Sequence, residues 1–175
     1  ISQTFYNSKL RNEINGSASH PEGGFTANNM DSNSYRKGLE TRINYNINRY
    51  SDASISYDYV DSTQYNSSTE NQQAEVRRPR NLININYNNN FFNNLSINSN
   101  IFYSSKVKDT DFSSYPFQNV YMNSYFLFNT TLNYDVDSKN KVSLIFKNIF
   151  NREYNVVNDF NTPGFEVLIN YRNNF

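Results

Sequence analysis

Side chains that could do covalent or metal chemistry are few and scattered in this chain of 175 residues. It has no cysteine and a single histidine, His20, so neither a disulfide framework nor a metal site built on Cys or His can form. The sequence shows no nucleophile–base pair, no paired catalytic carboxylates and no glycine-rich phosphate loop. We therefore predict that the chain is not an enzyme and carries no resident cofactor.

Two carboxylates stand close together in one segment, at Asp109 and Asp111. Carboxylate oxygens are the ligands that Ca²⁺ prefers, which makes calcium a candidate ion for this loop. A calcium ion takes roughly six to eight oxygen ligands, so these two residues alone do not define a site.

The composition excludes several classes of protein. The formal net charge is +0, which argues against capture of nucleic acid by a basic face. No stretch approaches the ~18 consecutive apolar residues of a membrane-spanning helix. The mean hydropathy of −0.81 resembles that of a disordered chain, but 17% of the residues are Tyr or Phe, and disordered chains are poor in aromatic residues. The pattern of residues along the chain must therefore decide whether the chain is disordered or folded.

Most of the chain alternates apolar with polar residues, the period of a strand with one buried face. In the last such run, Val167, Ile169 and Tyr171 alternate with Asn170 and Arg172. With a weaker first segment at 1–12, the pattern predicts about eight antiparallel strands and no helix. The other predicted strands are 39–47, 53–59, 83–87, 95–103, 126–136, 142–150 and 165–175.

The predicted connections alternate between long and short. The long ones are 13–34, 61–80, 106–121 and 151–164, and the short ones are 48–51, 89–94 and 137–140. Outer-membrane β-barrels show this alternation, with long loops outside the cell and short turns in the periplasm. We therefore favour an antiparallel transmembrane β-barrel in the cell outer membrane over a soluble sandwich with one solvated face.

The two faces of the predicted strands fit such a barrel. Apolar side chains would meet lipid, while rows of Asn and Ser would line a wet interior. An open sheet in lipid would leave unpaired backbone groups at its edges, each costing several kcal/mol. The interior of a small closed barrel is filled by side chains, for which short Asn and Ser are poorly suited. A share of a wider barrel fits better. Aromatic residues near strand ends are expected to form interfacial girdles: Tyr45, Tyr50, Tyr87, Phe91, Phe92, Tyr134, Phe150, Tyr171 and Phe175.

The end of the chain carries a family resemblance. The run KNIFNREY at 147–154, the run NTPG at 161–164 and a last strand ending in Phe175 resemble the C-terminus of TonB-dependent outer-membrane receptors. The resemblance implies that residues 1–175 are the last eight strands of a barrel of about 22 strands with a plugged lumen. It also implies that the plug domain and the TonB box lie N-terminal to this segment. The start at Ile1, without an initiator Met or a signal peptide, fits a segment or mature fragment.

Within this family, the run DFSSYPFQNVYM at 111–122 is similar to a loop of the vitamin B12 (cobalamin) receptors. The resemblance implies that Arg77 and Phe112 contact the ligand. The Arg77 guanidinium could donate to amide or phosphate oxygens, whereas Phe112 stands at a family Tyr position and lacks the hydroxyl. The alternatives are that Arg77 positions the start of a strand and that Phe112 packs within its loop. Phe175 is the expected barrel-assembly signal, or else one more lipid-facing residue.

These observations lead to a hypothesis of transport. The chain is expected to be part of a receptor that imports a corrinoid with TonB-derived energy. Its expected partners are cobalamin or another metal chelate, outer-membrane lipid, the TonB complex through the missing N-terminal part, and the barrel-assembly machinery. The alternatives are a TonB-dependent siderophore or haem receptor, or a free-standing small outer-membrane barrel or adhesin.

Overall fold

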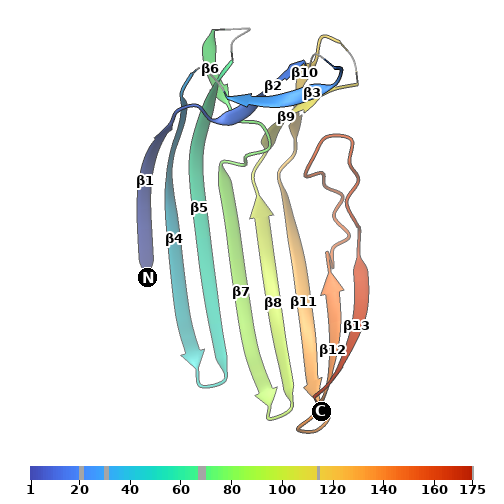
Figure 1. Cartoon of the computed structure of the whole chain (residues 1–175). Coiled ribbons are helices and arrows are strands. Elements are labelled where there is room, and N and C mark those ends of the chain that lie inside the picture. Colours follow the sequence, from blue (N-terminus) through green and yellow to red (C-terminus); the bar gives the residue numbers. More distant parts are fainter. Residues whose placement is uncertain (20–21, 30–31, 67–69, 114, 175) are drawn as a thin grey trace.

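The chain forms one curved antiparallel sheet (Figure 1). The computed structural model describes residues 1–19, 22–29, 32–66, 70–113 and 115–174. The sheet has nine strands, and eight of them form its continuous path: β1 (Ser2–Leu10), β4 (Ser34–Asn48), β5 (Ser51–Asn66), β7 (Asn81–Phe92), β8 (Leu95–Ser104), β11 (Tyr125–Asp135), β12 (Asn140–Lys147) and β13 (Glu166–Asn173). They follow one another in chain order around the sheet, and every neighbouring pair is antiparallel. The predicted all-β antiparallel architecture is confirmed.

Several strands are longer than the alternation of side chains indicated. β4 begins at Ser34 rather than at residue 39, and β5 runs to Asn66, inside the predicted loop 61–80. β7 reaches Phe92, which leaves only a tight turn where residues 89–94 were predicted to connect strands. Pairing continues past the amphipathic part because the ladder is made by backbone groups, which need no apolar side chain.

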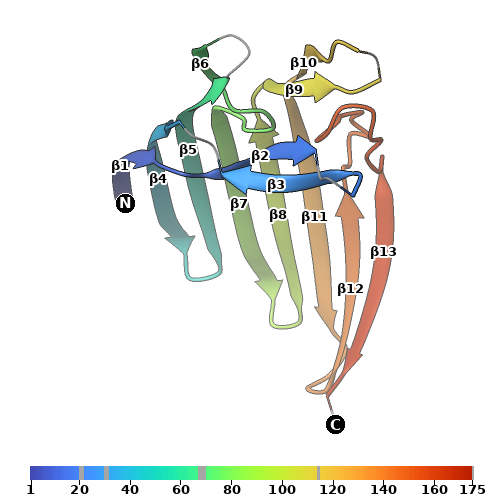
Figure 2. The same ribbon diagram turned by 45° about the horizontal axis from the view of Figure 1, so that its top comes forward.

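The long connections contain five short strands that the sequence analysis did not predict. These are β2 (Ile14–Ser19), β3 (Phe25–Asn29), β6 (Asn71–Ala74), β9 (Val107–Asp111) and β10 (Gln118–Met122). β2 pairs with β3, β9 pairs with β10, and β6 pairs with the last residues of β5, Thr63–Asn66. The β2–β3 hairpin runs across the end of the sheet from which the long connections leave (Figure 2). These strands carry little apolar alternation, so pattern analysis could not detect them.

The predicted alternation of connections is confirmed by their positions. The long connections all leave one end of the sheet and the short turns lie at the other (Figure 1). At one short turn, the Asp137 carboxylate accepts hydrogen bonds from the backbone N–H groups of Lys139 (2.8 Å) and Asn140 (2.9 Å). We call the end with the long connections the loop end and the end with the short turns the turn end.

One face of the sheet is apolar and remains uncovered by the described chain. Ile55, Ile85, Ile101 and Phe128 are consecutive cross-strand partners on this face, and Ile55 and Ile101 are exposed. Among the residues that the structure describes, Met122 is the one buried apolar side chain. The Ile, Phe and Tyr rows therefore do not enclose a dry core, and we call this the outward face.

The opposite face carries two rows of hydrogen-bonded polar side chains that cross four strands, β5, β7, β8 and β11. In the first row, each amide donates to its neighbour toward β5: Asn88 to Asp52 (2.9 Å), Asn98 to Asn88 (2.8 Å) and Asn133 to Asn98 (2.8 Å). The second row links Ser54, Asn86, Asn100 and Asn129 in the same sense. Donors and acceptors largely satisfy one another, which suits the wet interior expected for this face.

Aromatic side chains gather near both ends of the outward face. Tyr45, Tyr134 and Tyr171 are exposed near the turn end. Phe150 contacts the rings of Phe126 and Phe128, with centroids 5.8 Å apart in each case. This distribution matches the two interfacial girdles of membrane barrels.

A lysine placed on each face in turn tests this assignment. Ile85→Lys puts a cation at the middle of the outward face, where lipid contact would cost about 2–4 kcal/mol, so the folded full-length protein should be depleted in outer membranes. The matched variant Asn84→Lys, one residue away on the polar face, should be tolerated. Folded protein can be measured by its heat-modifiable mobility in electrophoresis, and equal loss in the two variants would contradict the assignment.

Candidate ligand-binding surface in the loops

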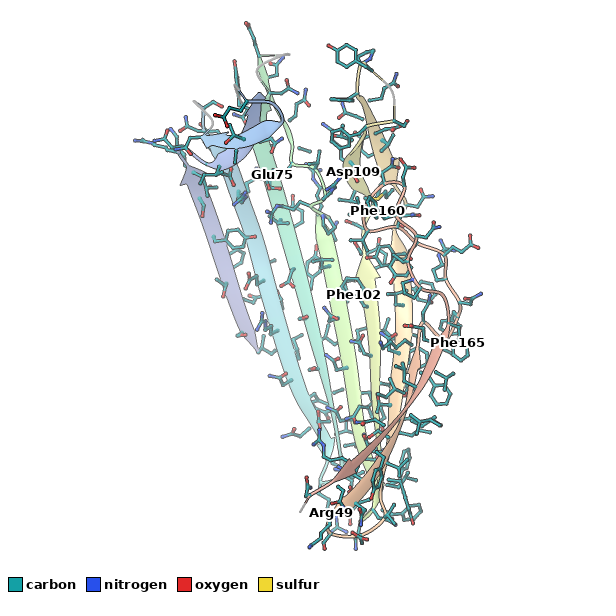
Figure 3. All side chains as sticks on the ribbon, turned by 45° about the vertical axis from the view of Figure 1, so that its right-hand side comes forward. Arg49, Glu75, Phe102, Asp109, Phe160 and Phe165 are labelled. Atoms are coloured by element: carbon teal, nitrogen blue, oxygen red, sulfur yellow. The ribbon has the colours of Figure 1, made fainter. Side chains whose placement is uncertain are left out.

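The Asp109 carboxylate joins three separate loops at the loop end (Figure 3). It is fully buried and accepts hydrogen bonds of 2.8 Å from Arg77 Nε, from the backbone N–H of Thr110 and from the backbone N–H of Asn158. Arg77 precedes β7, Thr110 lies in β9, and Asn158 belongs to the loop between β12 and β13. One side chain therefore holds three connections that are remote in sequence.

Charge and hydrogen bonding keep Asp109 ionised. Burial alone raises its pKa, but the backbone donors of Asn158 and Thr110 and the Arg77 guanidinium outweigh that effect. The net result is a pKa below the ordinary value of an aspartate.

Arg77 is fixed by its backbone as well as by its side chain. Its φ is +58°, in the left-handed region that non-glycine residues seldom adopt, and its N–H donates to the carbonyl of Lys108 (2.7 Å). The Arg77 side chain is nevertheless about half exposed. This geometry shows that Arg77 braces the loops, and its predicted contact with a ligand stays a prediction.

A second buried carboxylate, Glu75, braces the neighbouring part of the loop end. It pairs with Arg36 (2.7 Å) and Arg78 (2.5 Å), and Glu13 also pairs with Arg36. Burial raises the pKa of Glu75, but the hydrogen bond from Arg36 and the charge of Arg78 bring it below its ordinary value. The Arg-rich run at 77–80 was visible in the sequence, but its acidic partners were not.

The resemblance motif near the C-terminus organises the last loop. Buried Asn148 accepts a hydrogen bond from the N–H of Arg152 (2.8 Å) and donates from Nδ2 to the carbonyls of Arg152 (2.9 Å) and Pro163 (3.3 Å). Asn151 accepts from the N–H of Phe165 (2.9 Å), and its Oδ1 lies where a Cβ on Gly164 would be. The motif therefore has a structural role as a loop brace.

Phe112 belongs to an exposed aromatic cluster on the β9–β10 hairpin. Its side chain is 63% exposed, and its ring centroid lies 5.1 Å from that of Phe117, which in turn lies 5.8 Å from Tyr115. Of these three residues, only Phe112 was predicted from the sequence, through the family resemblance of the run 111–122 in which all three rings lie. This aromatic cluster (Phe112, Tyr115 and Phe117) presents apolar surface at the loop end, next to the loops held by Asp109.

A polar hollow of about 490 Å³ lies between the start of β11 and the last loop. Tyr125 and Tyr154 pack together within its lining, with ring centroids 4.5 Å apart, and Phe102 lies 6.0 Å from Tyr125. Arg152 and Asn158 also line it. The hollow combines aromatic faces with hydrogen-bonding groups, as small-molecule sites do.

The candidate calcium ligands are engaged within the protein. Both oxygens of Asp109 accept hydrogen bonds, and Asp111 Oδ1 accepts from the N–H of Ser113 (2.8 Å). In the described ranges, no group of three or more acidic or histidine side chains could hold a metal ion. His20 lies outside the described residues, and so does Phe175, the predicted barrel-assembly signal.

Known structures share this fold. The siderophore receptor PirA of Acinetobacter baumannii matches with a TM-score of 0.75 and 13% identity, over 99% of this chain and 29% of that one. The ferric-catecholate import receptor Fiu of E. coli K12 also matches with a TM-score of 0.75, at 12% identity over 99% of this chain and 25% of that one. The ferripyoverdine receptor of the Pseudomonas aeruginosa outer membrane matches with a TM-score of 0.75 and 12% identity, over 99% of this chain and 24% of that one. Protein-family models and curated protein sequences gave no match.

The chain thus spans about a quarter of the length of the receptors it matches. Its fold is that of a section of the barrel of these receptors. The uncovered apolar face of the sheet agrees with the predicted outer-membrane location. The described part of the chain contains no helix that could span a membrane.

Removing the charge of Asp109 should loosen three loops at once. In Asp109→Asn, a buried charge-assisted pair is lost, and amide exchange in β9 and at Asn158 should accelerate by about tenfold or more. Hydrogen–deuterium exchange of the full-length protein measures this. The matched variant Asp111→Asn removes an exposed carboxylate that caps only Ser113 and should leave Asn158 unchanged; equal effects of the two variants would contradict the brace.

The same brace should weaken in acid. Because the folded-state pKa of Asp109 is lowered, its stabilising contribution is complete above the ordinary value near 3.9 and is lost as the pH falls through the lowered value. Protection of Asn158, corrected for intrinsic exchange, should be constant from about pH 7 to 5 and fall below about pH 4. Asp109→Asn should abolish this dependence, and its persistence in that variant would assign it to another group.

Proposed function

We propose that this chain forms part of the wall and loops of an outer-membrane receptor that imports a metal chelate with TonB-derived energy. The observation that carries the proposal is the loop end, where buried carboxylates hold several loops around exposed aromatic rings and a polar hollow. Loops fixed before binding lose little conformational entropy when a ligand arrives.

The open edges of the sheet support a wider barrel. β1 and β13 lie at opposite edges, each pairing on one side only among the described strands. In lipid, such edges would leave backbone groups without partners at several kcal/mol each. We propose that further strands complete a barrel of about 22 strands, with the plug domain and TonB box N-terminal to this segment. The barrel-assembly machinery would insert it.

The ligand that we propose is a corrinoid, on the likeness of the run 111–122 to the vitamin B12 receptors. Phe112 would offer an aromatic face to the ligand, and the half-exposed Arg77 side chain would donate to its amide or phosphate oxygens. A ferric siderophore is the second candidate, because structural neighbours include receptors named for siderophores and ferric catecholates.

A free-standing small barrel or adhesin is the competing function. It would use the same loops to bind a surface partner without transport. The native mass of the protein in detergent separates the two, since a receptor of the proposed kind is about four times as long as this segment.

Binding to the full-length protein tests the proposal. Calorimetric titration with cyanocobalamin, with and without calcium, and with a ferric catecholate should show binding of the corrinoid. Binding of the ferric catecholate alone would replace the corrinoid by the siderophore alternative, and binding of neither would overturn the import proposal.

Loss of the aromatic cluster should weaken that binding. Phe112→Ala combined with Phe117→Ala should raise the Kd about tenfold, because stacked rings contribute about 0.5–1.5 kcal/mol each beyond their buried area. The matched control is Phe160→Ala, which removes a ring that is 68% exposed in the last loop. Arg77→Ala should also weaken binding, and an unchanged Kd would leave Arg77 with its bracing role alone.

A further inference from the structure

A shallow apolar groove crosses β1, β4 and β5 on the outward face. Its centre is a row of register partners, Phe5, Leu39 and Tyr59, which share the face of Ile55 and the other apolar rows. The groove holds about 490 Å³, and Phe5 is 75% exposed. The lining consists of Phe5, Tyr6, Asn7, Lys37, Gly38, Leu39 and Tyr59.

The parity of the strands places this groove on the lipid-facing side. Phe5, Asn7, Lys37, Leu39 and Tyr59 all point to the outward face, because side chains alternate along each strand. Of the polar-face residues in the same register, Tyr6 and Gly38 also line the groove, whereas Thr4, Ser8, Glu40 and Asp58 do not. Tyr6 turns to the polar face, where its ring lies against Gly38 at the position that a Cβ would occupy.

Three cations border the groove on its loop-end side. Lys37 Nζ lies 3.3 Å from Asp61 Oδ2, and Arg80 Nη2 lies 2.7 Å from Asp61 Oδ1. Lys9 Nζ lies 5.9 Å from the ring centroid of Tyr35, its register partner. The Lys37 and Arg80 side chains are 66% and 62% exposed. With one carboxylate among three cations, this edge of the outward face is positively charged.

We propose that the groove and these cations bind a phosphorylated lipid of the surrounding membrane. An acyl chain would lie along Phe5, Leu39 and Tyr59, and the phosphate would contact Lys9, Lys37 and Arg80. Long cationic side chains keep their charge at the headgroup level while their stems cover apolar surface, and clustered cations beside membrane segments bind anionic headgroups. The site is separate from the loop surface proposed for the chelate.

The pairing of groove and charge favours a lipid over free phosphate. Free phosphate would use the cations but gain nothing from the apolar groove, whereas a lipid satisfies both. A folded protein partner would need a surface outside the bilayer, and this groove lies on strands whose outward face carries the apolar rows. The lipid is therefore the occupant that fits both features.

Native mass spectrometry of the full-length protein in mild detergent tests the proposal, with diphosphoryl lipid A as the probe. The variant Lys9→Gln/Lys37→Gln/Arg80→Gln should bind it about tenfold or more weakly, because each cation near a headgroup contributes to affinity. The matched control is Arg49→Gln/Lys139→Gln, which removes exposed cations at the turn end and should change binding less than about twofold.

Two further variants keep the test decisive if the triple variant folds poorly. Asp61→Asn removes the competing carboxylate and should tighten binding of the lipid. Phe5→Ser alters a largely exposed side chain and should weaken binding of the lipid without changing binding of inorganic phosphate. Unchanged binding by both variants, equal binding of dephosphorylated lipid, or full competition by inorganic phosphate would each overturn the proposal.

Discussion

The structure depends on one constraint, which is that each side of the sheet must suit a different solvent. Alternation along a strand places neighbouring side chains on opposite faces. The register of the strands therefore determines which side chains lie on the apolar face and which lie on the polar face. The row Ile55, Ile85, Ile101 and Phe128 shows the outcome on one face, and the Asn rows show it on the other. A slip of one residue in any pair would exchange the two.

The polar face solves a problem that an apolar core does not have. Short amide side chains cannot fill a lumen, but they can satisfy one another, and here each row runs in one direction from strand to strand. Such rows add cross-strand hydrogen bonds to the backbone ladder. A stable sheet without a dry core follows from this arrangement.

At the loop end, side-chain contacts rather than a backbone ladder hold the segments together. The loops lack the continuous ladder of the sheet, and buried Asp109 and Glu75 replace it with charge-assisted bonds to several segments. The same chain thus combines a wall that tolerates many polar residues with a surface in which single residues matter. The proposed ligand capture uses that surface, whereas the proposed lipid site at Phe5 lies on the wall.

The sequence by itself determined the eight strands, their two faces and the alternation of long and short connections, because these depend on a period of two that is local in the chain. A family resemblance in the sequence also singled out Phe112. The sequence could not show the five short strands in the loops, the brace at Asp109 or the cations around Asp61. The partners of Asp109 lie 32 and 49 residues away in the chain. Only the tertiary structure brings them together, since closing such loops depends on contacts that no local pattern records.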